Sequence, residues 1–509
     1  MTRHGLPFQY EAQERESGLT ALGGLPLYLE LAHVSGLADS IRKRLCVRGA
    51  QGWSDVQVVT AIVLLNLAGG DCVEDIDKLE HDEGFAGILR RAQLWDLPRH
   101  ERRDLERRWR KARERAVPSP SAIRRYLEEF HDPKMEGLRP EEGAFIPAPH
   151  EQLRNLMGVH KDVLAFIQGR SPRTEATLDV DATLIETHKA TAEYSYKHFK
   201  AYQPLNVWWA EQGLVLHTEF RDGNVPAGFE VLRVVEEALE MLPAGVTKLW
   251  VRSDTAAYQH AFLKWLLDPT KHPRFGVIEF AISCDVTVAF KKAVAEVPES
   301  EWHPYIRPGG LPSKKEWAEV CFVPDGMGFS KRRTPYRFIA TRELLEEQPL
   351  PGLEVQQTLP FPTMRWTGRQ YKVFGIVTSL PEQDGWTGNK VITWLHGRCG
   401  KSEEAHSVMK EDLAGGKLPS GLFGANAAWW WMMILAFNLN TAMKRLVLGG
   451  TWVDRRLKTI RFHIIHVAGR LLRGARQFRL RLACTVEELV LFTNAKEVMT
   501  AMAVAPSTG

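Results

Sequence analysis

One short stretch constrains the fold more than any other: residues 177–185, with the sequence TLDVDATLI. Apolar and β-branched residues dominate it and no Gly or Pro interrupts it, which is typical of a buried strand. Because side chains alternate along a strand, Asp179 and Asp181 point to the same face. A buried carboxylate needs a partner, and a metal ion is one candidate. Two solvated carboxylates on a half-exposed strand are the alternative.

The overall composition excludes several classes of protein. The chain has 509 residues, which predicts several domains, and a net charge of only +4. Its six Cys are scattered without a CxxC pair, which argues against a zinc site and against a disulfide framework. The N-terminal residues have no apolar run typical of a signal peptide, and polar residues interrupt the apolar stretch 427–448. We therefore expect a protein of a reducing, cytoplasmic setting with no membrane partner; the bacterial, nucleoid-associated location that we also expect is implied only by the family resemblance given below.

The first 150 residues are predicted to be helical and basic. Ser54 is a plausible N-cap for a helix that runs to Leu67, and Gly69-Gly70 ends it before a second helix at 72–79. This pattern fits a helix-turn-helix and equally a small helical bundle. Between residues 90 and 125 lie 13 Lys and Arg against five Asp and Glu, which favours phosphate contacts over a merely solvated helix face. The predicted DNA contacts are Arg107, Arg108, Arg110 and Lys111, and Ser121 is the expected cap of the next helix.

The region after the linker 131–150 alternates strands and helices. Strands are expected at 177–185, 205–210 and 214–221, then a helix at 225–241, a strand at 248–252, a helix at 255–267 and a strand at 275–283. A meander followed by β-α-β units predicts a mixed α/β fold, with one mixed sheet flanked by helices. Both Asp181 and Asp254 belong to strands of that sheet. Asp254 ends its strand, where sites of α/β proteins usually gather.

A third carboxylate follows a region of different character. Residues 285–390 contain short strand-like runs between Pro, Gly and charged turns, and 391–395 is predicted as a strand. A helix then opens with Ser402 as its expected cap, and Glu403 shares its open face with Lys410, near Arg398 and Lys401. A carboxylate among basic residues suits a site for a metal ion and a phosphate; an ordinary capped surface helix is the alternative. The apolar helix 426–448 is expected to pack beneath the sheet.

In this order, the motifs resemble the DDE transposases of bacterial insertion sequences, with a ribonuclease-H-like core and a β-rich insertion before the last carboxylate. The residues that carry the resemblance are Leu178-Asp179-Val180-Asp181-Ala182-Thr183, Tyr202-Gln203-Pro204-Leu205, Arg221-Asp222-Gly223-Asn224-Val225, Val251-Arg252-Ser253-Asp254, and Arg398-Cys399-Gly400-Lys401-Ser402-Glu403-Glu404 running on to Lys410. The expected segments are 1–150 (DNA binding and linker), 151–284 (first part of the core), 285–390 (insertion), 391–450 (last part of the core) and 451–509 (basic C-terminal segment).

The resemblance implies specific site residues. Asp181, Asp254 and Glu403 would hold two Mg²⁺ or Mn²⁺ ions, and Asp179 and Glu404 remain alternates. The family's Tyr, Arg, Glu, Lys signature matches only in part, because His396 stands where Tyr is expected and an extra residue separates Arg398 from Glu403. The spacing from Glu403 to Lys410 favours Glu403 over its neighbour.

The resemblance also implies partners. Arg252, Arg398, Lys401 and Lys410 would hold phosphates, and Asn224 would line the site. The basic N-terminal region would bind terminal inverted repeats, and joining two ends to target DNA implies a homodimer on DNA. A metal-dependent nuclease without strand transfer and a catalytically dead DNA-binding protein are the competing interpretations.

Overall fold

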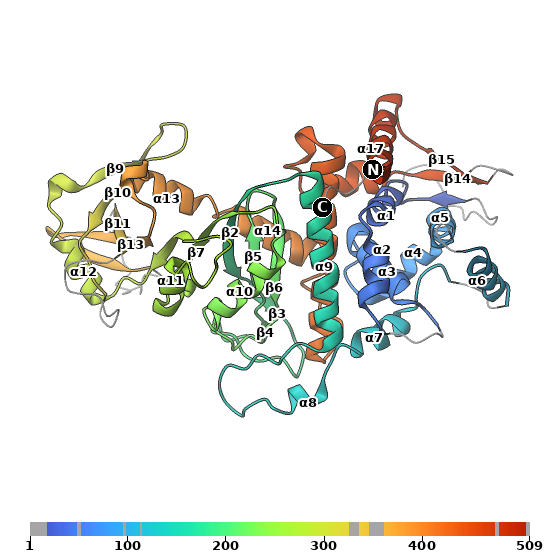
Figure 1. Cartoon of the computed structure of the whole chain (residues 1–509), viewed down its shortest axis with the longest axis horizontal. Coiled ribbons are helices and arrows are strands. Elements are labelled where there is room, and N and C mark those ends of the chain that lie inside the picture. The colour runs from blue at the N-terminus through green and yellow to red at the C-terminus, as the bar shows by residue number, and fades with distance from the viewer. Residues whose placement is uncertain are drawn as a thin grey trace, which may run out of the picture. The chain divides into compact units, whose positions relative to one another are not determined.

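A ten-stranded sheet is built around the strand that carries Asp179 and Asp181 (Figure 1). The computed structural model describes residues 18–47, 52–94, 98–111, 115–324, 335–345, 361–473 and 478–504. The chain divides into two compact units. The sheet unit comprises Met135–Ala148 and Ser171–Ser407, and the helical unit comprises Met1–Lys134, Pro149–Arg170 and Val408–Gly509.

The core of the sheet unit is a mixed sheet in the strand order β6-β5-β2-β7-β8. Its strands are β2 (Glu175–Ala182), β5 (Leu205–Trp209), β6 (Leu214–Glu219), β7 (Lys248–Ser253) and β8 (Glu279–Cys284). β2, β5 and β6 pair antiparallel as a meander, whereas β2, β7 and β8 run parallel. The predicted mixed α/β architecture is confirmed, and β2 lies at the centre of this core with neighbours on both sides.

Helices connect the parallel strands. α10 (Val231–Met241) follows β6, and α11 (His260–Leu267) joins β7 to β8. The buried residues Val231, Val234 and Ala238 recur at helical spacing, so one face of α10 packs against β6. Both helices begin later than expected. Glu230 takes a left-handed conformation before α10, and a 3₁₀ turn (Thr255–Ala257) precedes α11.

The insertion is β-rich, as predicted, and it extends the sheet. Its strands are β9 (His303–Ile306), β10 (Pro312–Val320), β11 (Arg337–Leu344), β12 (Thr363–Trp366) and β13 (Arg369–Thr378), and α12 (Val288–Ala295) precedes them. β13 pairs antiparallel with β8 of the core and with β11 of the insertion. The insertion and the core therefore share one continuous hydrogen-bonded sheet.

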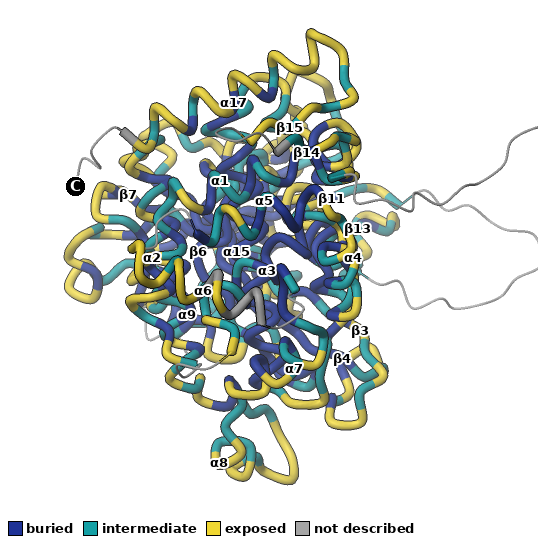
Figure 2. The backbone as a smooth tube through the Cα atoms, turned by 90° about the vertical axis from the view of Figure 1, so that its right-hand side faces the viewer, coloured by how far each residue is buried: buried dark blue, intermediate teal, exposed yellow. Residues whose placement is uncertain are grey.

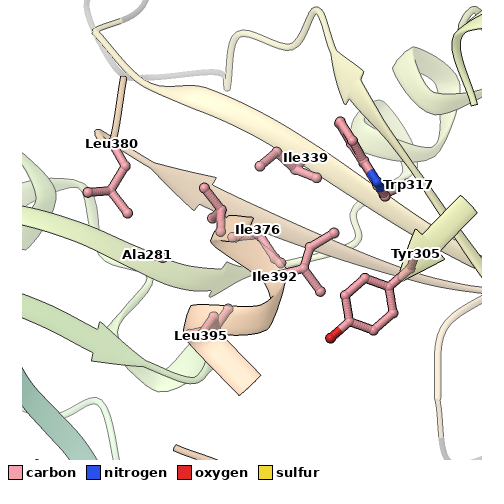
Figure 3. Packing of buried hydrophobic residues seen from close by; sticks show 9 residues of the cluster. Ala281, Tyr305, Trp317, Ile339, Ile376, Leu380, Ile392 and Leu395 are labelled. Carbon is pink, nitrogen blue, oxygen red and sulfur yellow. The ribbon is translucent and has the colours of Figure 1, made fainter. Parts of the chain in front are cut away.

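A helix packs on the extended part of this sheet. α13 (Gly388–His396) buries Val391, Ile392 and Leu395 against Ile339 and Ile376 (Figure 3). The prediction of a strand at 391–395 is therefore wrong. The segment is helical because the side chain of Thr387 accepts a hydrogen bond from the backbone of Lys390, and apolar residues then recur at helical spacing.

The helical unit is organised around α15 (Phe423–Ala442), which is buried along nearly its whole length (Figure 2). This helix packs against α3 (Asp55–Ala68), α7 (Pro120–Glu128) and α9 (Glu151–Arg170). We expected it beneath the sheet, but its extensive contacts lie within the helical unit. An all-round apolar helix needs partners on every side, and the surrounding helices supply them.

The sequence predicted the N-cap residues of two helices in the helical unit. Ser54 is the N-cap of α3, as expected, and it also forms a capping box with Gln57. For α7 the predicted cap Ser121 is wrong: Ser119 accepts from the backbone of Ala122, because Pro120 opens the helix. The other elements of the unit are β1 (Leu19–Thr20), α1 (Leu25–Val34), α2 (Leu37–Arg44), α4 (Ile76–His81), α5 (Glu83–Gln93), α6 (Arg99–Lys111), α8 (Pro133–Glu136, at its edge), α16 (Leu457–Ile460), β14 (Gly469–Arg473), β15 (Phe478–Leu482) and α17 (Val486–Val504).

No single helix in the described ranges is long and apolar enough to cross a membrane. One bent pair, α3 with residues 73–81, meets that test by length and composition only.

Candidate active site

Two carboxylates lie at the same end of the sheet because their neighbouring strands, β2 and β7, run parallel. In the register of β2 and β7, Asp179 pairs with Arg252 and Val180 with Ser253. The residues that follow Val180 and Ser253 are Asp181 and Asp254. Side chains two residues apart on a strand share a face, so the pairing of Asp179 with Arg252 also defines the face of Asp181. Asp254 additionally accepts a hydrogen bond from the backbone of Ala256 at 3.0 Å, which fixes the turn that follows β7.

Asp179 and Arg252 form a buried ion pair. Arg252 Nε donates to Asp179 Oδ1 at 2.6 Å, and Nη2 donates to Oδ2 at 2.7 Å. The third nitrogen, Nη1, donates to the carbonyl oxygen of Trp394 in α13 at 2.6 Å. Each nitrogen of this guanidinium is occupied inside the protein. Arg252 is therefore placed as an internal brace between β2, β7 and α13, rather than as the open phosphate donor that we expected.

Asp181 lies in a different electrostatic environment. Its carboxylate is 19% exposed, and Oδ2 lies 3.4 Å from Nη2 of Arg398. Burial raises the pKa of Asp181 from 3.8 to about 6; Arg398 opposes this rise, and the negative charges of Asp254 and Glu403 add to it. The structure thus brings Asp254 and Glu403 within electrostatic reach of Asp181. Like charges held together in a partly buried site favour a bound cation.

Glu403 lies on α14 (Lys401–Ser407), directly after the turn at Gly400. Its carboxylate accepts a hydrogen bond from the backbone N–H of Gly400. Ser402 is not the expected cap: it lies inside α14, and its hydroxyl donates to the carbonyl oxygen of Arg398 at 3.1 Å. Glu404 and Lys401 are exposed on the same short helix. Glu403 is the residue of the adjacent pair that acts on the charge of Asp181.

Arg398 has donor capacity left for a ligand. Its side chain is only 10% exposed, yet its contact with Asp181 is long for a hydrogen bond. Within the described part of the chain, its Nε–H is buried and has no hydrogen-bond partner. An unpaired buried guanidinium nitrogen is costly unless a partner arrives. Since guanidinium groups match phosphate oxygens in geometry, Arg398 is well placed for the phosphate role predicted for it.

Sequence reasoning missed a buried polar chain beside Asp181. Across the sheet, Asp181 pairs with Asn206 of β5, and Asn206 pairs with Thr218 of β6. The Thr218 hydroxyl donates to Asn206 Oδ1 at 2.7 Å, so the Asn206 amide nitrogen is free to donate to His406 Nε2, 3.4 Å away. His406 lies three residues beyond Glu403 and is buried. This chain connects α14 to the strands next to Asp181.

The signal for this chain is present in the sequence. Asn206 interrupts the apolar run LNVWW in the same way that the two aspartates interrupt their strand. A fully buried amide in a central strand needs partners, just as a carboxylate does.

The remaining predicted contacts lie elsewhere. Asn224 donates to the carbonyl oxygen of Gly143 at 3.2 Å, in the segment 135–148. Arg139 of the same segment forms an ion pair with the buried Asp222 at 2.8 Å. Lys410 lies in the π-helical turn Val408–Asp412, which belongs to the helical unit. Asn224 is thus engaged by the linker segment, and Lys410 belongs to the helical unit.

The predicted DNA-binding residues lie on α6, which carries seven Arg or Lys and three Asp or Glu. Arg107 is exposed and lies 3.5 Å from Asp104 one turn away. The side chains of Arg108, Arg110 and Lys111 lie outside the described residues. A helix of this charge with an exposed Arg retains the character expected of a phosphate-binding element.

Both segments of the predicted helix-turn-helix are helical, but the second one is acidic. α3 and the segment 73–81 meet at 95° after a four-residue turn that contains Gly69-Gly70. The second segment, however, carries Glu74, Asp75, Asp77 and Glu80 against a single Lys. Such a helix would repel DNA phosphates, so α6 is the better candidate for the contact.

The carboxylate site fits a hard divalent cation in its chemistry. Three carboxylates are the oxygen ligands that Mg²⁺ and Mn²⁺ prefer, and their mutual repulsion at Asp181 is what a cation would relieve. Among the described residues, no three His, Cys, Asp or Glu side chains stand close enough together to form a ready-made metal site. In this structure, the guanidinium of Arg398 places a positive charge beside Asp181.

Comparison with known proteins identifies the family. The sequence model described as "Transposase DDE domain group 1" matches residues 9–322 and 363–503, which is most of the chain. The chain belongs to this family of DDE transposases. Members of such a family cleave DNA and transfer its strands, and they use divalent metal ions.

Other comparisons add little to this assignment. No curated protein matches the transposase described here. Among solved structures, it is similar to the cryo-EM structure of a piggyBac transposase synaptic complex with hairpin DNA. The identity is 11% and the TM-score 0.41, over 95% of this chain and 81% of that one. Similarity at this level does not establish a shared site or function.

Proposed function

We propose that this chain is the transposase of an insertion sequence, which binds the terminal inverted repeats, cleaves DNA at the element ends and joins the 3′-hydroxyl ends to target DNA. The observation that supports the proposal is that the negative charges of Asp254 and Glu403 both act on Asp181, at the end of β2, in a chain of the DDE transposase family. A site of three carboxylates with a partly unpaired arginine suits phosphodiester chemistry.

Each residue of the site has a distinct task in this proposal. Asp181, Asp254 and Glu403 would hold two Mg²⁺ or Mn²⁺ ions. When bound, such ions activate the attacking oxygen, first of water and later of a 3′-hydroxyl, and stabilise the leaving oxygen. Arg398 donates its unpaired Nε–H to an oxygen of the scissile phosphate. Lys401, exposed on the first turn of α14, adds positive charge that attracts the DNA strand.

Residues behind the site keep these groups in place. The Asp179–Arg252 pair joins the ends of β2 and β7 to α13, so that Asp181 and Asp254 stay in register. His406, through Asn206 of β5, connects α14 to the strand that pairs with β2. A site that must align an attacking oxygen with a phosphate depends on such support.

The DNA contacts of the proposal lie in the helical unit. α6 supplies the positive charge for the terminal repeats, and binding there should weaken steeply with salt. Two element ends must be brought together before joining, so we propose that the protein acts as a homodimer on DNA.

The test uses the purified chain, Mg²⁺, a linear DNA that ends in the inverted repeats flanking the gene, and a supercoiled target plasmid. The proposal predicts cleaved ends and joined products, both lost in Asp181→Asn, Asp254→Asn and Glu403→Gln while end binding persists. Cleavage without joined products would instead indicate a nuclease. End binding with neither reaction would indicate a DNA-binding protein, and activity that survives all three substitutions would contradict the site.

A further inference from the structure

A hairpin that exposes two tyrosines follows the strand of Asp181. Residues 187–200, here called the tyrosine hairpin, connect β3 (Ile185–Glu186) to β4 (Ala201–Tyr202) in the sheet unit (Figure 1). Tyr194 is 62% exposed and Tyr196 is 68% exposed. The ammonium groups of Lys200 and Lys197 lie over these two rings, each 5.7 Å from the ring centre. Exposed aromatic rings with adjacent cations are the features of surfaces that bind unpaired nucleotides.

The turn that carries the tyrosines is ordered by its own hydrogen bonds. Tyr194 and Lys200 form an antiparallel bridge. The backbone N–H and the hydroxyl of Ser195 both donate to the carbonyl oxygen of Phe199, at 2.8 and 2.9 Å. His198 closes the turn in a left-handed conformation, with φ at +64°. These hydrogen bonds order the backbone that carries both rings at the surface, so little backbone entropy remains to be lost when a ligand binds.

The base of the hairpin is attached to the catalytic strands. A Cβ on Gly223 would lie 2.6 Å from the carbonyl oxygen of Ala201 and 2.9 Å from that of Glu193, so only glycine fits there. Tyr202 forms an isolated bridge with Asp222. The backbone N–H of Thr183, two residues after Asp181, donates to the carbonyl oxygen of Pro204 at 3.0 Å. The hairpin is thereby fixed to the segment that leaves the carboxylate site.

The charge of the hairpin favours a polyanion. Its sequence, THKATAEYSYKHFK, contains three Lys, two His and a single acidic residue. A patch that recognised only duplex phosphates would need the lysines alone. Two flat apolar rings beside them offer stacking surfaces, which duplex DNA cannot use because its bases are already stacked.

We propose that the tyrosine hairpin binds the unpaired nucleotides next to the cleaved phosphate, with Tyr194 and Tyr196 stacking on bases and Lys197 and Lys200 contacting the backbone. This inference rests on the proposed function, because it takes DNA as the substrate of the carboxylate site. It adds a specific substrate form: a DNA end with a short single-stranded extension, rather than a blunt duplex.

Binding measurements on the full chain test the inference. The protein carries Asp181→Asn so that DNA is not cut, and the probes are one duplex with blunt ends and the same duplex with a four-nucleotide dT extension. Stacking on an aromatic ring contributes roughly 5- to 150-fold in affinity per base. We expect the double variant Tyr194→Ala/Tyr196→Ala to bind the extended probe at least about tenfold more weakly and the blunt probe within about twofold of the parent.

Matched variants separate stacking from charge and from folding. Tyr194→Phe/Tyr196→Phe keeps both rings and should bind the extended probe like the parent. Lys197→Gln/Lys200→Gln should weaken binding of both probes and reduce the salt dependence of binding. Because both tyrosines are exposed, the thermal midpoint of the alanine variant should not change.

Two results would overturn the inference: equal losses on both probes, or no loss on the extended probe. Neither depends on cleavage or joining, since the parent variant is inactive by design. The inference can therefore fail while the proposed transposase activity stands. Conversely, the alanine variant could bind the extended probe more weakly while the wild-type chain shows no strand transfer. The hairpin would then be a single-strand binding site on a different kind of DNA enzyme.

Discussion

Replacing Asp179 by alanine should destabilise the protein far more than replacing Asp181, although the two residues share one face of one strand. Asp179 is 7% exposed and makes two hydrogen bonds to the buried Arg252. Its removal leaves a buried guanidinium without its counter-charge, which costs about 3–5 kcal/mol. In a unit of about 250 residues, each kcal/mol lowers the melting temperature by roughly 2–4 °C, so we expect a fall of roughly 6–20 °C.

Calorimetry on the metal-free protein gives the measurement, and two variants serve as controls. The double variant Asp179→Leu/Arg252→Met removes both charges and should recover most of the lost stability, because no buried charge is left unpaired. Asp181→Ala, on the same strand, should not lower the melting temperature comparably, because burial and neighbouring carboxylates already penalise the charge of Asp181. An unchanged melting temperature for Asp179→Ala, or a double variant no better than the single one, would refute this reasoning.

Three further predictions concern the site. In EDTA, Asp181→Asn should gain stability relative to the wild type as pH rises from about 4 to 6, by up to about 3 kcal/mol. The reason is that the pKa of Asp181 is raised from 3.8 to about 6 in the folded protein, so the wild type binds this proton more tightly when folded and loses that stabilisation as pH rises. A constant difference in denaturation midpoints across this range would contradict the assignment. His406→Ala should slow single-turnover cleavage by about 10- to 100-fold with little change in DNA affinity, and wild-type rates would exclude a positioning role. Arg398→Ala should reduce the cleavage rate more than Arg398→Lys does, and equal rates would show that its charge and donors are not used.

The local pattern of the sequence was enough to predict the core of the sheet. The run around Asp181 is a central strand, and the order of the following strands and helices was correct because each has a clear apolar period and a turn signal at its end. The same rules failed for residues 391–395, where the short apolar run fits a strand and a helix equally well. Length and the cap at Thr387 decided in favour of the helix.

Long-range partners could not be predicted in this way. Two aspartates on one face of β2 look equivalent in sequence, and what separates them is contributed by distant residues: Arg252 for Asp179, and Arg398 for Asp181. Arg252 was expected to hold phosphate because the resemblance to DDE transposases implied that role. Only the parallel register of β2 and β7 shows that it pairs inward.

The central claim is that Asp181, Asp254 and Glu403 together form the catalytic site, and the adjacent pair Glu403 and Glu404 offers the most direct test. Single-turnover cleavage of repeat-ended DNA in Mg²⁺ should be measured for Glu403→Gln and Glu404→Gln, which are neighbours on one helix and undergo the same chemical change. Loss of a metal ligand removes several kcal/mol of transition-state stabilisation, or at least about 100-fold in rate. We expect that loss for Glu403→Gln and a rate near wild type for Glu404→Gln; the reverse result would contradict the assignment of Glu403 to the site.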